Sequence, residues 1–345
     1  MSAEAPIHDY NDKTPWKPSY HNAKRVELVV KSICGLFALI SIATTFGILG
    51  TLIFEAIEFF KEVSLWHFLT ATKWKPLFND PEYGISVLIS GTLLTSSIAI
   101  LTAVPLGLLS AIFLSEYASL AVRKILKPML EVLAGIPSVV FGYFAVLTVT
   151  PFLQTAFEFL ATPIQIPEAL NFLPFTYYVE PSYFLEPPIP YLEVFNALSA
   201  GLILGVSITP LIASLSEDAI YSVPQGLRDG AYALGATKRE TVAAVVLPAA
   251  LSGIVASVIL AISRAVGETM IVTLAAGQNP ILGFNPFGPV MTMTAYIVQV
   301  STGDVAVGTL KYKTIFAVGT TLFCTTLILN IFSFWFVRRF RERYD

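Results

Sequence analysis

The chain has 345 residues, of which 55% are hydrophobic and only 13% are charged. Soluble domains carry about 25% charged residues, so this composition excludes an ordinary soluble enzyme, a disordered chain and a disulfide-rich secreted module. The formal net charge of −3 argues against a nucleic-acid partner. Cys34 and Cys324 lie in apolar runs without metal-ligand spacing, so no metal site is expected.

An apolar run of about 20 residues is long enough to cross a bilayer as a helix. The chain has six such runs, at 32–54, 84–115, 132–157, 194–216, 241–276 and 314–337. The backbone polar groups of a segment in lipid must be satisfied within the segment, so each run is expected to be helical. The sequence therefore predicts an all-α integral membrane protein with six transmembrane helices.

The basic residues indicate how these helices are oriented. Most of the 21 Lys and Arg residues lie before the first run, between the second and third, between the fourth and fifth, and after the last. Cytoplasmic loops carry an excess of Lys and Arg, so both termini are predicted to be cytoplasmic. The expected organisation is a cytoplasmic tail (1–31), a first span with its outer loop (32–83), a domain of five spans (84–337) and a basic tail (338–345).

The predicted outer loops leave their roles open. Residues 55–83 contain Trp66 and Trp74, a residue type that favours the membrane interface. Residues 158–193 are rich in proline, which limits regular structure, and contain no Lys or Arg. This segment, together with 278–310, either receives an external partner or only connects two spans.

The predicted cytoplasmic segment 217–248 is too polar for a span and too patterned for an unstructured loop. Residues 224–226 are typical of a turn. Residues 227–234 are compatible with a helix, which Gly235 would end in the left-handed conformation.

A second short helix is expected directly after the first. Thr237 would open it, with Glu240 three residues later completing a capping box. In the first helix, Leu227, Ala231 and Leu234 share one apolar face. That face either docks on a partner or packs on the protein itself.

This segment resembles the cytoplasmic signature of the membrane subunits of bacterial ABC importers. The family pattern is Glu-Ala-Ala, then Gly, then Ile-x-Leu-Pro, and this chain has Asp229-Gly230-Ala231, Gly235 and Val245-x-Leu247-Pro248. Asp replaces Glu and Gly replaces Ala. In that family the loop is the coupling helix, which sits in a groove of the ATPase subunit. The resemblance implies that coupling to the ATPase involves Arg228, Asp229, Gly230, Ala231, Leu234, Gly235, Ala236, Thr237 and Glu240.

Arg264 and Glu268 lie within the fifth apolar run. Ionisable residues inside a membrane are costly and mark a functional site by default. Four positions apart, the two would share one face of a continuous helix. They either serve a substrate pathway or form an internal salt bridge that holds helices together.

The residues around this pair narrow the resemblance to the permeases of the high-affinity phosphate importer. The similar motifs are Arg264-Ala265-Val266-Gly267-Glu268-Thr269, Ala275-Ala276-Gly277, residues 133–142, Pro105-Leu106-Gly107 and Ser115-Glu116-Tyr117. Met270 resembles the PstC-type subunit more than the PstA-type. The resemblance implies a type I, MetI-like ABC importer permease fold. We expect the substrate pathway to involve Arg264, Glu268, Thr269 and Ser138.

The resemblance also implies partners and a location. The sequence has no Gly-Lys dipeptide and so no P-loop; no cofactor is expected on this chain, and ATP and Mg would bind a separate ATPase dimer. The other implied partners are a second, PstA-type permease and an external phosphate-binding protein, in a bacterial inner membrane. The main alternative is a secondary transporter or channel driven by an ion gradient. A membrane enzyme is disfavoured because His, Cys and carboxylate clusters are lacking.

Overall fold

The computed structural model describes residues 20–161 and 192–340. Within these residues, six helical segments are long and apolar enough to cross a membrane: Val26–Glu62, Ser86–Tyr117, Ser138–Glu158, Ala197–Tyr221, Lys238–Gly267 and Leu310–Trp335. This confirms the predicted all-α membrane architecture, with the six spans in the expected order. The bounds of all six spans differ from the predicted runs, and the third and fifth runs are in addition interrupted.

The chain forms two compact units, Met1–Phe54 and Glu55–Asp345. The described part of the first unit belongs to one long helix, α1 (Tyr20–Glu62). Its large apolar side chains, such as Phe37 and Phe46, are exposed, which suits a helix that crosses the hydrocarbon layer of a membrane. The predicted domain boundaries at 31/32 and 83/84 stay predictions.

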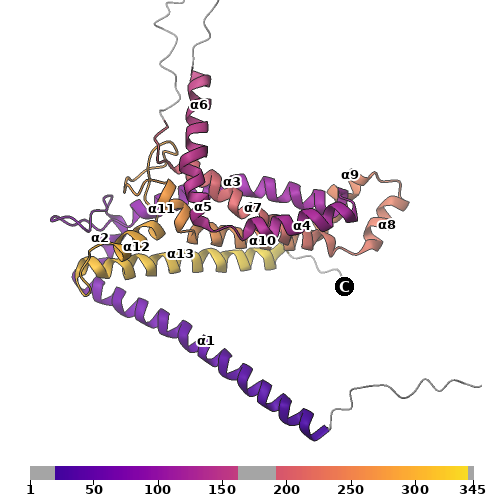
Figure 1. Cartoon of the computed structure of the whole chain (residues 1–345), viewed down its shortest axis with the longest axis horizontal. Helices are drawn as coiled ribbons and strands as arrows, with labels where there is room; N and C mark the ends of the chain where they lie inside the picture. Colours follow the sequence, from indigo (N-terminus) through magenta and orange to yellow (C-terminus); the bar gives the residue numbers. More distant parts are fainter. Residues whose placement is uncertain (1–19, 162–191, 341–345) are drawn as a thin grey trace, which may run out of the picture. The chain divides into compact units, whose positions relative to one another are not determined.

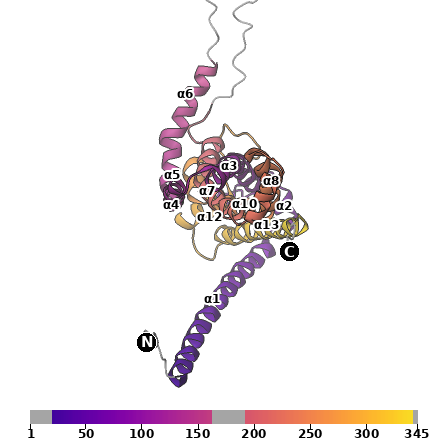
Figure 2. The ribbon, with the colours of Figure 1, turned by 90° about the vertical axis from the view of Figure 1, so that its right-hand side faces the viewer.

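The second unit is built on three helices that lie side by side (Figure 1): α3 (Ser86–Ile112), α7 (Ala197–Tyr221) and α10 (Leu247–Gly267). They stay together in the turned view of Figure 2. Gly205 lets α7 approach α3 closely, since a Cβ there would lie 2.7 Å from the backbone oxygen of Ala99. Such small residues are typical of tightly packed membrane helices.

The third apolar run is not one helix. Helix α4 (Leu120–Ala134) ends before Gly135, and helix α5 (Ser138–Phe144) begins after Pro137. The predicted start of this span at residue 132 is therefore wrong, and the span begins at Ser138. Proline lacks an amide hydrogen and disfavours the helical conformation of the residue before it, which explains the break. A π-helical turn, Ala145–Val149, then leads into α6 (Thr150–Ala161).

The fifth apolar run is also interrupted. Helix α10 ends at Gly267, Glu268 has an extended backbone (φ −65°, ψ 136°), and the short helix α11 (Met270–Ala275) follows. The prediction of one helix continuing to residue 276 is wrong. The Thr294 hydroxyl donates a hydrogen bond of 2.7 Å to the Glu268 carbonyl, so a side chain from another element satisfies a backbone group at the break.

The end of the second unit away from α8 contains α2 (Leu65–Thr70), α12 (Met293–Thr302) and the start of α13 (Leu310–Phe340), as Figure 1 shows. Aromatic side chains pack against one another there. Trp74 is buried there, with its ring 4.9 Å from that of Tyr296 and almost perpendicular to it. Trp74 is thus packed within the protein, whereas Trp66 is exposed, and the expected interfacial position of this segment stays a prediction. Of the predicted outer loop 158–193, residues 162–191 lie outside the described residues.

Candidate functional site

The predicted coupling segment begins later than expected, because α7 remains helical to Tyr221. The short helix α8 (Gln225–Ala233) follows, with Pro224 as its N-terminal flanking residue. The predicted turn at 224–226 is therefore the start of a helix. Proline is tolerated there, since the first amides of a helix have no intrahelical acceptor.

Gly235 ends α8 as predicted, with a φ of +86°. The Gly235 amide donates a hydrogen bond to the Tyr232 carbonyl (2.9 Å), and the Ala236 amide donates to the Ala231 carbonyl (3.1 Å). These two bonds form a Schellman motif, in which a glycine adopts the left-handed conformation without the strain of a Cβ.

Helix α9 (Lys238–Thr241) opens with the predicted capping box. The Glu240 amide donates to Thr237 Oγ1 (3.4 Å), and the Thr237 amide donates to Glu240 Oε2 (2.8 Å). Two orphan amides at the start of the helix are thereby satisfied. Helices α8 and α9 lie together at one end of the helix bundle (Figure 1).

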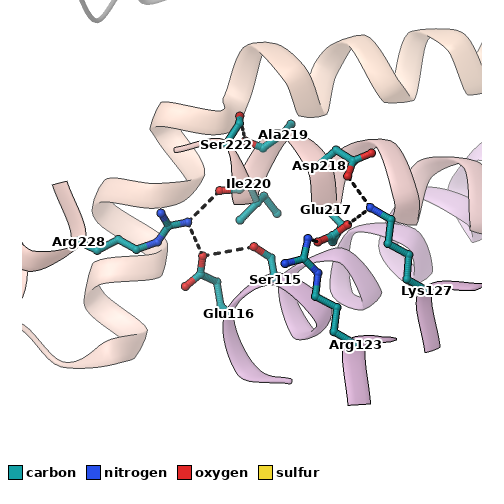
Figure 3. Close-up of polar contacts among 10 residues, drawn as sticks. All are labelled: Ser115, Glu116, Arg123, Lys127, Glu217, Asp218, Ala219, Ile220, Ser222 and Arg228. Atoms are coloured by element: carbon teal, nitrogen blue, oxygen red, sulfur yellow. Dashed lines mark hydrogen bonds and ion pairs between the residues drawn. The ribbon is translucent and has the colours of Figure 1, made fainter. Parts of the chain in front are cut away.

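The Arg228 side chain points into the protein, and the residue is only 8% exposed. Its guanidinium donates to Glu116 Oε1 (2.8 Å), to the Ile220 carbonyl (2.9 Å) and to the Val223 carbonyl, as Figure 3 shows for the first two. Arginine suits this position because its fork offers five donors in a fixed geometry. The Arg228 side chain anchors α8 to the rest of the protein, and its expected part in coupling to the ATPase stays a prediction.

The other predicted coupling residues lie on the outer side of the segment. Ala231 and Ala236 are half-buried, and the rest are exposed: Asp229, Gly230, Leu234, Gly235, Thr237 and Glu240. The expectation of a single apolar face is wrong. Leu227 packs against a buried cluster that includes Ile220 and Val246, whereas Leu234 is 90% exposed. The sequence left open whether this face docks on a partner or packs on the protein itself. In the structure Leu227 packs inward, whereas Leu234 faces outward and is available to a partner.

Glu217, near the end of α7, is fully buried and pairs with two cations of α4 (Figure 3). Arg123 forms an ion pair with Oε1, and Lys127 Nζ lies 2.7 Å from Oε2 and 2.5 Å from Asp218 Oδ1. Arg123 also lies over the Tyr221 ring, 3.8 Å from its centroid. Burial disfavours the charged form of Lys127, but its hydrogen bonds to Asp218 and Glu217 outweigh this and raise its pKa above the ordinary value.

The sequence alone does not reveal this cluster. Its one signal is the opposite charge of two segments, basic at 123–127 and acidic at 217–218. Which of these charges meet depends on how α4 packs against α7, and neither charge nor spacing specifies that packing.

Arg264 and Glu268 do not share a helical face, because α10 ends between them. Arg264 is exposed, and within the described residues its guanidinium forms no ion pair or hydrogen bond. Glu268 is half-buried, and its Oε1 accepts a hydrogen bond from the Met270 amide (3.2 Å). An internal Arg264–Glu268 salt bridge, one of the two readings of the sequence, is absent from the described part of the chain.

Ser138 and Thr269 lie at the starts of two short helices that pack on each other. Ser138 is the first residue of α5, and Thr269 directly precedes α11. The two helices approach closely at Gly142, where a Cβ would lie 2.8 Å from Leu274 Cδ1 and 3.3 Å from the Met270 backbone oxygen. The structure thus places both predicted residues next to breaks in adjacent helices.

An open groove of about 490 Å³ lies beside these two helices. Its lining is mainly apolar and consists of Tyr143, Val146, Leu147, Phe195, Thr273, Leu274, Gly277 and Gln278. None of the four predicted pathway residues lines it.

Comparison with known proteins assigns the chain to a family of transport proteins. Residues 103–345 match the family described as "Binding-protein-dependent transport system inner membrane component". The probable ABC transporter permease protein YqgH of Bacillus subtilis is 32% identical over 322 residues, which covers 92% of this chain and 91% of that protein. The phosphate transport system permease protein PstC of Mesorhizobium japonicum is 37% identical over 274 residues, covering 79% and 78% respectively.

Solved structures support the same fold. A bacterial ABC transporter involved in the import of the acidic polysaccharide alginate contains a chain that matches with a TM-score of 0.56 and 16% sequence identity, covering 92% of this chain and all of that chain. The curated relatives are named as permeases, which agrees with the expectation of a transport subunit rather than an enzyme. The chain belongs to the binding-protein-dependent transport permeases and, within them, to the PstC-type permeases.

Proposed function

We propose that this chain is a membrane permease subunit of an ATP-driven phosphate importer, which passes inorganic phosphate from an external binding protein into the cytoplasm. The observation that carries the proposal is Arg264, an exposed cation in a membrane-spanning segment, which has no ion pair or side-chain hydrogen bond within residues 20–161 and 192–340. Relatives of the chain are named as phosphate transport system permeases. An unpaired charge in such a segment is costly, which favours a role in substrate passage over a purely structural one.

Arg264 is suited to a transient phosphate contact. A guanidinium presents donors in a planar fork that fits two phosphate oxygens, and it stays charged in a poor solvent. A single Arg would hold the anion weakly, and passage requires release as well as entry.

Glu268 complements this contact from the break between α10 and α11. Its Oε1 accepts the Met270 amide, while Oε2 has no hydrogen bond among the described residues. That oxygen could accept a hydrogen bond from the protonated oxygen of hydrogen phosphate, which sulfate lacks. When the pathway is empty, the negative charge of Glu268 would also reduce the electrostatic attraction between Arg264 and an anion.

The exposed side of α8 and α9 is proposed to dock on a nucleotide-binding subunit, which carries ATP and Mg. Gly230 and Gly235 have open space where a Cβ would point, so a partner surface could approach the backbone. Leu234 offers an apolar anchor, being 90% exposed. A dimer of this ATPase would serve the chain and a second, PstA-type permease.

The proposed orientation places α8, α9 and both termini in the cytoplasm of a bacterium, with the chain in the inner membrane. The support is the concentration of Lys and Arg in these segments. Residues 278–310, with 158–193, would then form the outward surface that receives the phosphate-binding protein.

The substrate is tested in proteoliposomes that contain the complete transporter. With ATP on the α8 side and the binding protein on the other, labelled phosphate should enter, and excess sulfate should not reduce its entry. Phosphate entry without ATP would indicate a secondary transporter, and equal entry of sulfate would refute phosphate selectivity.

The docking surface is tested by cross-linking, in a background with Cys34→Ser and Cys324→Ser. Ala231→Cys should cross-link to the nucleotide-binding subunit through a short reagent that reacts with this thiol at one end and with a lysine amine of the partner at the other. Ala306→Cys, exposed at the other end of the bundle, is the matched control and should not. A cross-link from Ala306→Cys but none from Ala231→Cys would contradict the proposed docking side.

A further inference from the structure

Helix α4 faces the protein with two cations and with the half-buried side chains of Leu126, Leu130 and Leu133. Arg123 and Lys127, four residues apart and so on one helical face, reach α7. The opposite side carries exposed apolar residues, including Ile125, Met129 and Val132. No residue of α4 is fully buried. Ion pairs of Arg123 and Lys127 therefore hold α4 in place together with half-buried leucines such as Leu133.

The charged contacts of α4 meet at one buried carboxylate, that of Glu217. The Glu217 side chain is fully buried, and both of its carboxylate oxygens face a cation of α4. Removing one partner of a buried ion pair is strongly destabilising, so such a pair holds its two elements in a fixed arrangement. Helix α4 is thus bound to the end of α7 that leads into α8.

A second buried pair joins α8 to the π-helical turn Phe113–Tyr117, which ends the second span and precedes α4. Arg228 and Glu116 have side chains that are 10% and 7% exposed, with 2.8 Å between the guanidinium nitrogen and the carboxylate oxygen. Tyr117 follows Glu116 in the chain and forms a cation–π contact with Lys238 of α9. The Lys238 Nζ lies 4.9 Å from the centroid of the Tyr117 ring. Both short helices of the coupling segment therefore contact the π-helical turn at the end of the second span, which ends at Tyr117, three residues before α4 begins at Leu120.

The other end of α4 reaches the break at Gly135 and Pro137. Beyond it, α5 begins at Ser138 and packs against α11. A short non-helical connection between two rigid helices is where a change in backbone angles is most easily absorbed. Helix α4 is consequently the element that joins the coupling segment to the helix breaks near the proposed pathway.

We propose that Glu116 and Glu217 are positioning residues that make α4 follow the coupling segment, so that a movement of α8 reaches the break at Pro137. The proposal rests on the proposed function, since it assumes that α8 is moved by an ATPase. A physical account of coupling between distant sites names an element with two arrangements that both sites bias. Glu217 would hold α4 to α7 in that element, and Glu116 would hold α8 to the helical turn that precedes α4.

The test measures phosphate imported per ATP hydrolysed in the complete transporter, together with the amount of assembled complex. Glu116→Gln and Glu217→Gln should each lower this ratio by between about 5-fold and 150-fold, the usual range for a coupling between two sites. Lys124→Gln removes an exposed charge of the same helix and should leave the ratio unchanged. A merely structural role would lower the amount of complex and leave the ratio per complex at the wild-type value, which would overturn the proposal.

Arg228→Lys provides a variant that is expected to assemble even if the carboxylate variants do not. Lysine keeps the charge opposite Glu116 but lacks the fork that also reaches two carbonyls, so the ratio should fall less than in Glu116→Gln. The double variant Glu116→Gln, Arg228→Gln should import no less phosphate per ATP than the single variant with the larger loss. The reason is that the two residues act as one pair, so removing the second adds no further loss. A wild-type ratio in Arg228→Lys, or additive losses in the double variant, would overturn the proposal.

The cross-link at Ala231→Cys separates the two proposals. If it forms but the carboxylate variants keep the wild-type ratio, the docking function stands and the role of α4 is refuted. If the cross-link does not form, the proposed docking function is refuted. The role of α4 is then refuted as well, because it assumes that the ATPase moves α8.

Discussion

Two sites of this chain each contain one Arg and one Glu. In one site the two side chains are bonded to each other, and in the other they are not. Arg228 and Glu116 come from distant parts of the chain, are both buried and are bonded to each other. Arg264 and Glu268 are four residues apart, yet a helix ends between them and Arg264 is exposed. The first pair is satisfied within the protein and can only hold elements together. The second site is left with donors and acceptors for something else.

The energetic contrast follows from burial. Charges taken out of water must be paired and hydrogen-bonded, and Arg228 has a carboxylate and two carbonyls around its guanidinium. Arg264 has no such set among the described residues. A bilayer would make this unfavourable unless water, a partner chain or an anion reaches it. Proximity in sequence is therefore a poor guide to which charges neutralise each other.

The largest expected effect concerns Arg264. Arg264→Gln should lower phosphate uptake by roughly 100-fold, comparable to the loss of one pre-organised anion donor in an enzyme, while the amount of assembled complex stays unchanged. Arg264→Lys keeps the charge but loses the fork and should also transport poorly. Labelled phosphate uptake, normalised to the complex measured in the same membranes, checks both variants.

Ser263→Ala is the matched control for this prediction. The Ser263 hydroxyl donates a 2.6 Å hydrogen bond to Asn330 of α13, so the variant loses a contact between helices at the adjacent position without changing charge. It should transport phosphate at close to the wild-type rate. If Arg264→Gln reduced only the amount of complex, the contrast between the two Arg sites would be lost, and Arg264 would be structural as well.

The next largest effect concerns the stability of the α4 cluster. Arg123→Ala combined with Lys127→Ala leaves the Glu217 carboxylate buried without a counter-charge, which should destabilise the protein by about 3–5 kcal/mol. Glu217→Gln removes the charge itself and should cost less, about 1–3 kcal/mol. Thermal unfolding of the detergent-solubilised protein measures the difference. Arg264→Ala, by contrast, should leave the unfolding temperature unchanged, and an equal loss there would contradict the comparison.

Much of the fold was accessible from the sequence, because it follows from local rules. Apolar runs long enough for a bilayer identify the spans, Gly235 ends a helix through its own conformational freedom, and Thr237 with Glu240 forms a capping box from residues three apart. Each of these features is decided by residues close together in the chain. The structure agrees at all three.

What the sequence did not reveal depends on tertiary contacts. The break after Gly267 leaves no local signal comparable to Pro137, and Thr294, from a distant segment, satisfies the Glu268 carbonyl there. The inward direction of Arg228 requires Glu116, 112 residues earlier in the chain, as its partner. Residue type and spacing therefore identified the correct segments. They could not show that Arg228 anchors a helix within the protein, whereas Arg264 is exposed and can contact a ligand.

The smallest expected effect concerns the exposed capping box at the start of α9. Thr237→Ala removes the hydroxyl that accepts the Glu240 amide, and loss of such a cap costs about 1 kcal/mol, a factor of about five in the population of the ordered form. Phosphate uptake should therefore fall by no more than about fivefold. Hydrogen exchange at residues 238–241 should become faster, whereas exchange in α8 should not change, because Arg228 still anchors that helix. If Thr237→Ala reduced uptake as strongly as Glu116→Gln, the exposed cap and not the buried pair would set the position of the coupling segment.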